Sequence, residues 1–230
     1  MPREKFEHDL HRLQDEILEL GAMAERAISE SVQTLKNKDI VHAQSIIEAD
    51  RHINEKRYAI ENEALTLIAT QQPMAGDLRT LAAILEIASE LERMADYAKG
   101  IANIAVMIGP EGLIKPLVDI PRMAAKACDM LHRSLEAFLR QDVDAARAIP
   151  KEDTEVDALY AQIYRELITY IMADPKAIDQ ATRLTWVAHN LERVADRVGN
   201  ICERIVFSIT GHGEELDTPP ALGGDQSGRR

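Results

Sequence analysis

The residues best suited to chemistry in this chain are acidic side chains spaced four positions apart, in the pattern Asp or Glu, three residues, Asp. The pattern occurs at Glu92/Asp96, Asp153/Asp157 and Glu192/Asp196. This spacing puts both carboxylates on one face of a helix, where like charges destabilise the helix by about 0.2–0.5 kcal/mol per pair. A bound cation would offset that repulsion, and oxygen donors without thiolates favour Mg, Mn, Fe or Ca over a structural zinc.

The placement of these pairs matters more than their number, because an acidic chain of this length contains about as many by chance. A shift of 100 residues superposes Leu91–Asp96 on Leu191–Asp196 with five identities in six positions. A shift of 103 residues superposes Asp50 and Asn54 on the pair 153/157. Asn54 offers a neutral carbonyl oxygen where the second half has a carboxylate, so we expect the first site to hold its cation less tightly.

Two other interpretations of these side chains stay open. In one, the acids form ion pairs with Arg93 and Arg193. In the other, they are simply hydrated side chains along a solvent-exposed helix edge. His189 is a metal ligand, a general base, or a histidine that lines a groove. Trp186 is expected in the core or at an interface rather than in a cofactor site.

The elements that position these residues are long helices. Prolines and glycines divide the chain into runs with helical periodicity. The expected helices span residues 4–35, 40–70, 75–107, 121–140, 142–172 and 176–209. Pro150 falls inside the fifth, where it kinks or delays the helix unless the helix begins there with proline at its first position.

The expected fold class is all-α, with two tandem antiparallel three-helix bundles related by the internal repeat. A helix cannot bury its apolar stripe alone, so each set of three closes into a bundle. The expected domains are residues 1–111 and 112–210. Residues 211–230 are rich in glycine and too poor in apolar side chains to offset ordering entropy, so a disordered tail is expected.

Composition excludes several classes of function. The 230 residues carry 27 basic and 39 acidic side chains, a net charge of −12 that disfavours nucleic acid. Two cysteines cannot form a disulfide framework or a four-thiolate zinc site. The sequence has no stretch apolar enough to span a bilayer, so a cytoplasmic protein is expected. The usual nucleotide, hydrolase and zinc-protease motifs are missing, as are the Glu-x-x-His pairs of di-iron bundles.

The combination of motifs resembles the PhoU family of phosphate-transport regulators. The resemblance rests on Gln72–Arg79, on Leu91–Asp96 and on Leu191–Asp196, and covers residues 5–212. It implies a tandem three-helix bundle that forms homodimers or higher oligomers and binds metal ions such as Mg, Mn, Fe or Zn. The metal ligands that it implies are Asp50, Asn54, Glu92, Asp96, Asp153, Asp157, Glu192 and Asp196.

The resemblance also implies partners. A regulator of this family is expected to link the ATPase subunit of a phosphate ABC transporter to a phosphate-sensing histidine kinase, and to hold the phosphate-starvation response and phosphate uptake down without catalysing a reaction. It would reach the membrane through these proteins. The alternatives are a metal-dependent phosphatase or other metalloenzyme that uses the same carboxylates and a helical scaffold without metal. The phosphatase lacks a repeated proton-transfer residue, because His189 has Ser89 as its counterpart.

Overall fold

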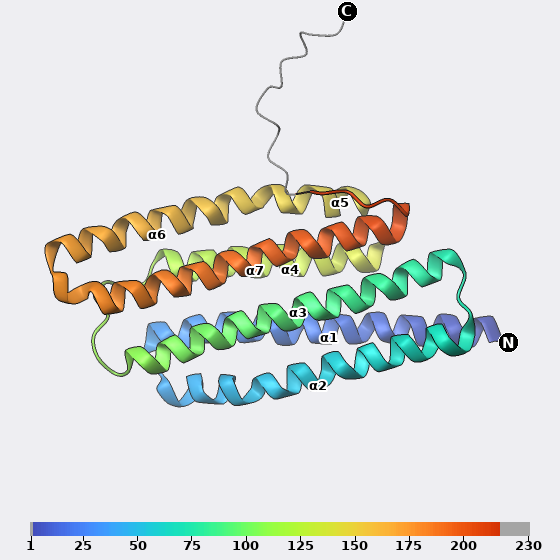
Figure 1. The fold of residues 1–230 in the computed structure, drawn as a ribbon, viewed down its shortest axis with the longest axis horizontal. Helices are drawn as coiled ribbons and strands as arrows, with labels where there is room; N and C mark the ends of the chain where they lie inside the picture. The colour runs from blue at the N-terminus through green and yellow to red at the C-terminus, as the bar shows by residue number, and fades with distance from the viewer. Residues whose placement is uncertain (1, 217–230) are drawn as a thin grey trace, which may run out of the picture.

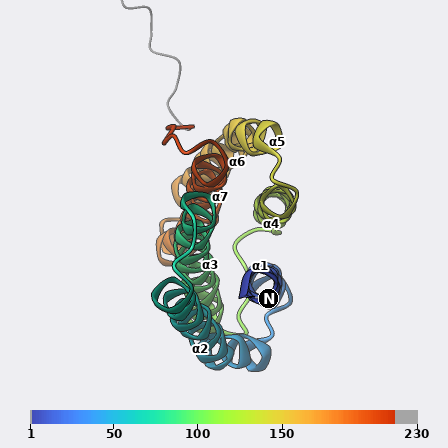
Figure 2. The same cartoon turned by 90° about the vertical axis from the view of Figure 1, so that its right-hand side faces the viewer.

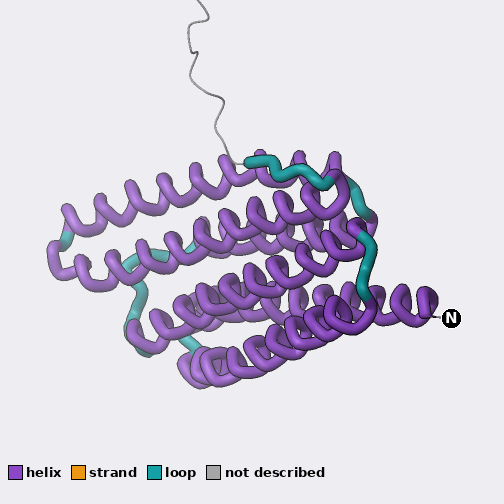
Figure 3. The backbone as a smooth tube through the Cα atoms, turned by 45° about the vertical axis from the view of Figure 1, so that its right-hand side comes forward, coloured by secondary structure: helices purple, strands orange, loops and turns teal. Residues whose placement is uncertain are grey.

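The computed structural model describes residues 2–216. The helices are α1 (Pro2–Asn37), α2 (Ile40–Gln71), α3 (Ala75–Ile108), α4 (Asp119–Arg140), α5 (Val143–Ala148), α6 (Asp153–Ala173) and α7 (Ile178–Thr210), with short 3₁₀ turns η1 (Ile149–Glu152) and η2 (Pro175–Ala177). The described residues contain no strand (Figure 3). The all-α prediction is confirmed, and five of the six expected helices differ from the observed ones mainly in the position of their ends.

The fifth expected helix, 142–172, is broken at Pro150. One and a half turns of α5 are followed by η1, with Pro150 near its start, and α6 begins three residues later. Glu152 fixes this break, because its carboxylate accepts hydrogen bonds from Lys126 and from both terminal nitrogens of Arg133 on α4, at 2.7–2.8 Å. Pro150 therefore kinks the segment and delays α6.

The turns that open the second helix of each half have matching geometry. Lys38 and its repeat counterpart Gln141 both adopt positive φ, at 58° and 53°. The aspartate that follows each of them caps the next helix, with Asp39 accepting from the His42 amide and Asp142 from the Ala145 amide. Two independent turns with the same conformation and cap support the internal repeat at the level of the backbone.

The two three-helix sets pack side by side through α3 against α7 and α1 against α4 (Figures 1 and 2). Gly21 allows the second contact, because a Cβ there would lie 2.2 Å from Leu135 Cδ1. Buried side chains of both halves form one continuous apolar core. The bundles are thus joined through their interiors, and the domain boundary near residue 111 stays a prediction.

A polar contact lies within the α3–α7 interface. Glu90 accepts a hydrogen bond from Asn200 at 3.1 Å and lies 3.4 Å from a terminal nitrogen of Arg197. Ten residues further along the same two helices, Asn190 lies against Gly100, where an added Cβ would come within 3.0 Å of the amide nitrogen. These contacts fix α3 relative to α7, the two helices that carry the Leu-Glu-Arg-x-x-Asp motifs.

Of the expected tail, residues 211–216 belong to the described structure and 217–230 lie outside it. Glu214 pairs with Arg147 of α5 at 2.7 Å, and the Leu216 amide donates to Glu203 of α7. In residues 2–216 no helix combines enough length with enough apolarity to cross a membrane.

Candidate functional site

The structure brings the predicted ligands of the first half together between α2 and α3. We call Asp50, Asn54, Glu92 and Asp96 the first carboxylate edge. Asp50 is its most buried member, with 6% of its surface exposed. Its Oδ2 accepts from Lys99 Nζ at 2.7 Å and from the Asn54 side-chain amide at 3.1 Å. Its Oδ1 is buried with no hydrogen-bond partner among the described residues, which is an energetically unfavourable state for a carboxylate oxygen.

The carboxylates of the first edge repel one another. Burial raises the pKa of Glu92, and the charges of Asp96 and Asp50 raise it further, whereas Arg57 lowers it. The pKa of Asp96 is raised by burial and by Asp50 and lowered by Lys99. Such shifts show that a further positive charge between α2 and α3 would be stabilising.

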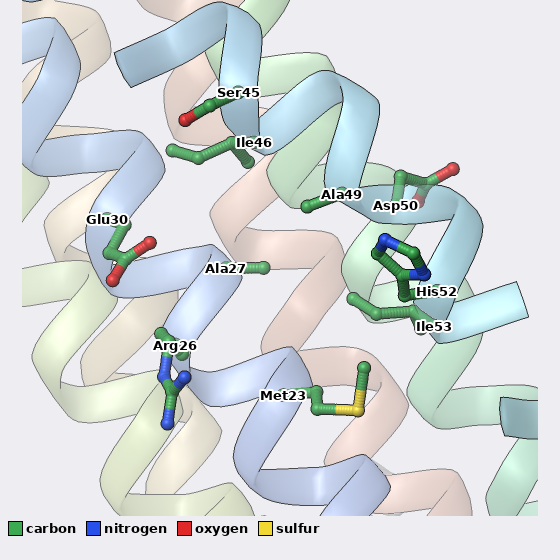
Figure 4. A pocket seen from close by; sticks show the side chains of 10 residues that line it. All are labelled: Met23, Arg26, Ala27, Glu30, Ser45, Ile46, Ala49, Asp50, His52 and Ile53. Atoms are coloured by element: carbon green, nitrogen blue, oxygen red, sulfur yellow. The ribbon is translucent and has the colours of Figure 1, made fainter.

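Asp50 also borders an open pocket between α1 and α2 with a volume of about 200 Å³ (Figure 4). Arg26 and Glu30 of α1 lie across from Asp50 and His52 of α2, with apolar side chains between them. Asp50 is thus a lining residue of this pocket, while its carboxylate points away from Arg26 and Glu30 and bonds Lys99 of α3 (Figure 4).

The second carboxylate edge consists of Asp153, Asp157, Glu192 and Asp196, on α6 and α7. Burial and the charge of Asp196 raise the pKa of Asp157. The pKa of Glu192 is raised by burial, by Asp196 and by Asp157, and lowered by His189 and Arg193. Asp153, at the start of α6, is half-buried. The mutual effects bring Asp157, Glu192 and Asp196 into one electrostatic cluster.

Two side chains of α7 contact this cluster from its own helix. Arg193 hydrogen-bonds Asp196 at 3.0 Å, and His189 Nδ1 lies 3.1 Å from Glu192 Oε2. The Arg193–Asp196 pair is partly exposed, so it offsets little of the repulsion. His189 is thus in contact with the second edge, as its role as a metal ligand would require.

The two edges differ in their built-in cations, which sequence reasoning missed. Lys99 and Arg57 compensate the first edge, whereas the repeat places Gly199 and Tyr160 at the equivalent positions. The second edge moreover has Asp157 in place of Asn54. Comparing the repeats for charge, as well as for identity, is the signal that could have found Lys99 and Arg57.

The donor chemistry of both edges fits a hard cation, but their side chains are not arranged around one. Within residues 2–216 no three His, Cys, Asp or Glu side chains are close enough to hold a metal ion. In the first edge Asn54 bonds Asp50 through its amide nitrogen. The partnerless Oδ1 of Asp50 and the raised pKa values mark where a cation would be stabilising, and side-chain rotation is needed to enclose it.

These features define a class of protein: an all-helical tandem repeat with one carboxylate edge in each half. A family model described as the PhoU domain matches residues 17–105 and again residues 120–205. The chain belongs to the PhoU family.

Similar proteins are named as accessory or regulatory proteins of phosphate transport. A phosphate-specific transport system accessory protein PhoU homolog of Clostridium acetobutylicum is 35% identical over 218 residues, covering 94% of this chain and all of that protein. The Escherichia coli K12 accessory protein PhoU is 33% identical over 219 residues, covering 93% of this chain and 91% of that one. The crystal structure of the phosphate transport system regulatory protein PhoU from Streptococcus pneumoniae has a TM-score of 0.85 at 32% identity, covering 92% of this chain and all of that one.

Proposed function

We propose that this chain is a cytoplasmic regulator of phosphate uptake that holds the phosphate-starvation response off when phosphate is plentiful. It acts as an adaptor, in homodimeric form, between the ATPase subunit of a phosphate ABC transporter and a phosphate-sensing histidine kinase. The observation that carries the proposal is the double match to the PhoU domain, together with a carboxylate edge in each matched half.

Metal ions bind the two carboxylate edges in this proposal. Glu92, Asp96 and Asp50 would hold a cation on the first edge, and Asp157, Glu192 and Asp196 on the second, with Asn54 and Asp153 at their ends. The ion supplies positive charge that neutralises the facing acids. Neutralised edges let α2 and α3, or α6 and α7, present one stable surface to a partner, which is a regulatory rather than a catalytic role.

The regulatory role is tested in cells with abundant phosphate by a phosphate-starvation reporter. We expect the reporter to rise when the gene is deleted and to fall again when the intact gene is restored. An unchanged reporter after deletion would overturn the proposal. A metal-dependent phosphatase assay on the purified protein then tests the alternative use of the same carboxylates.

Metal binding is tested by elemental analysis of protein purified without chelator. The informative variants are Glu92→Gln/Asp96→Asn and Glu192→Gln/Asp196→Asn, which remove charge and keep the shape of the side chains. We expect each double variant to lose the metal of its own edge. Unchanged metal content in both would remove these residues from the ligand set.

A further inference from the structure

An apolar groove lies between α6 and α7, in the half of these helices next to η2. It has a volume of about 320 Å³. Its lining residues are Tyr164, Leu167, Ile168, Ile171, Ile178, Thr182, Thr185 and Trp186. The exposed fractions of Trp186, Ile178 and Tyr164 are 57%, 53% and 49%. Trp186 is therefore not in the core, and large apolar side chains exposed together mark a surface that another molecule covers.

The groove is lined by side chains from two neighbouring helices. Tyr164, Ile168 and Ile171 follow one another at helical spacing on α6, and Ile178, Thr182 and Trp186 do so on α7. The two rows lie on neighbouring helices and both line the groove. Amphipathic helices bind such grooves through apolar side chains at positions i, i+3 or i+4, and i+7.

The internal repeat shows that the exposed aromatic side chains of this groove are special to the second half. The counterparts of Tyr164 and Trp186 in the first half are Glu61 and Glu86. Glu61 lies 3.6 Å from Arg57, and Glu86 lies 3.2 Å from Arg204. Two acids engaged in ion pairs within the chain thus correspond to two exposed aromatic rings, although both halves have the same backbone plan.

The groove leads directly to the second carboxylate edge. The Trp186 ring packs edge-on against His189 with their centroids 5.7 Å apart, and Tyr160 lies 6.4 Å from the same histidine. His189 in turn contacts Glu192. From Thr182, in the groove, to Glu192 is ten residues of one helix, or about 15 Å. A single bound helix of about 18 residues can cover both regions.

The acidic end of this surface has less positive charge of its own than the first edge has. In the first half Arg57 and Lys99 lie beside the acids, whereas Tyr160 and Gly199 replace them in the second half. The second edge also has one more carboxylate. When the second edge holds no metal ion, a basic side chain from a bound partner would therefore supply what the first edge obtains from its own chain.

We propose that the groove and the second carboxylate edge together bind one amphipathic helix of a partner protein. Its apolar side chains contact Tyr164, Ile168 and Trp186, and an arginine or lysine two to three turns further along contacts Asp157 and Glu192. The inference deepens the adaptor function proposed above and rests on it for the existence of a partner. It assigns the partner contact to the second bundle.

The chain's single tryptophan makes the binding directly measurable. The probe is a synthetic helical peptide of about 18 residues, built on alanine and glutamine, with leucines at i, i+4 and i+7 and two arginines two turns further on. A second peptide carries glutamine in place of both arginines. Titrations in chelator, with the full chain, keep the carboxylates free of metal.

We expect the arginine peptide to shift the Trp186 emission to shorter wavelength and to saturate, and the glutamine peptide to bind about tenfold more weakly. The variant Tyr160→Arg introduces the cation that the first half has at this position. It should therefore weaken the binding of the arginine peptide and leave the binding of the glutamine peptide unchanged. No emission change with either peptide up to about 500 μM would overturn the inference. An emission that depends only on protein concentration would assign the groove to a second copy of the chain, and would overturn it as well.

The second test of the groove measures the phosphate-starvation reporter in cells that carry variants of this protein. Ile178→Asp and Ile168→Asp place charge in the groove, and Leu78→Asp and Leu65→Asp place it at the repeat-equivalent exposed positions of the first half. We expect the starvation reporter to rise only with the groove variants, after circular dichroism has shown that all four fold. If deletion raises the reporter and the groove variants do not, the groove inference fails and the proposed function stands. If deletion has no effect, the proposed function fails and the peptide titration alone decides about the groove.

Discussion

At the scale of single residues, the contact between Asp50 and Lys99 determines the state of the first edge. Asp50 is almost fully buried, and Lys99 is the cation nearest to it among the described residues, at 2.7 Å. A buried carboxylate that loses its partner keeps the cost of desolvation without the compensating hydrogen bond. Lys99 therefore has a stabilising role that is separate from any role in metal binding.

We expect Lys99→Met to lower the free energy of unfolding by about 1–3 kcal/mol in chelator, because Asp50 is left uncompensated. Urea unfolding measures this loss. Adding Asp50→Asn to the same chain should restore part of it, since the charge that lacked a partner is gone. Lys151→Met, at an exposed lysine, is the control and should change stability by less than about 0.5 kcal/mol. Equal losses in both single variants would contradict the assignment.

The site residues show what a sequence reveals about chemistry. Glu92, Asp96 and Asp196 could be predicted to lie near acids of the neighbouring helix, because repeat and helical spacing fix their faces. The positions of Lys99 and Arg57 could not, since long flexible side chains choose among several acids and the choice depends on packing between helices. Asn54 likewise donates to Asp50 in the structure, an orientation that spacing alone does not define.

At the scale of elements, Glu152 is what stabilises the break between α5 and α6. Its contacts with Arg133 and Lys126 connect η1 to α4 and hold the pKa of the Glu152 carboxyl down, from 4.5 to about 2. Proline alone allowed either a kinked helix or a late start. The position of the break depends on these contacts with α4. The sequence alone therefore could not predict whether the helix is kinked at Pro150 or begins there.

The stability that Glu152 contributes should depend on pH in a defined direction. A carboxyl with a lowered folded-state pKa contributes fully above its unfolded value of 4.5, and the contribution disappears as pH falls toward about 2. We expect Glu152→Gln to lower the free energy of unfolding by about 1–2 kcal/mol at pH 7, allowing for its partial exposure. Urea unfolding between pH 7 and pH 3 should show the difference from the parent shrinking below about 4.5. A difference that stays constant over this range would argue against the ion-pair origin.

At the scale of the whole molecule, the halves have the same helices and different charge. The repeat predicted the fold, because paired apolar stripes and caps recur at fixed offsets. It could not predict that the two cores are continuous, since that depends on close approaches such as Gly21 against Leu135. The difference in charge between the edges leads to an expectation for metal binding.

We expect metal titration to show two classes of affinity, with the tighter class on the second edge. That edge has Asp157 where the first has Asn54, and it lacks the cations Arg57 and Lys99. Calorimetry with Mn²⁺ on Glu192→Gln/Asp196→Asn should remove the tighter class, and Glu92→Gln/Asp96→Asn the weaker. Lys99→Met should tighten the weaker class, because it removes a competing charge. A single class in the parent chain would contradict this ordering.

The contact between bundles gives a further prediction. Glu90→Ala leaves Arg197 without its partner inside the α3–α7 interface, where both side chains are mostly buried. We expect a loss of about 1–3 kcal/mol in unfolding free energy and faster amide hydrogen exchange along α3 and α7. Glu86→Ala removes an exposed pair with Arg204 between the same helices, so it should cost at most about 1 kcal/mol. Similar exchange rates in the two variants would show that Glu90 does not join the bundles.

The unequal charge of the halves also sets the stoichiometry and direction of any assembly. A duplicated chain with identical halves would have two equivalent binding sites for a partner. It would therefore bind two copies of the partner, or one copy in either of two orientations. Here Asn54, Arg57 and Lys99 reduce the negative charge of the first carboxylate edge, while the second edge stays acidic and lies beside an aromatic groove. The two halves are therefore not equivalent as binding sites. We expect a basic partner to bind once per chain and in a single orientation.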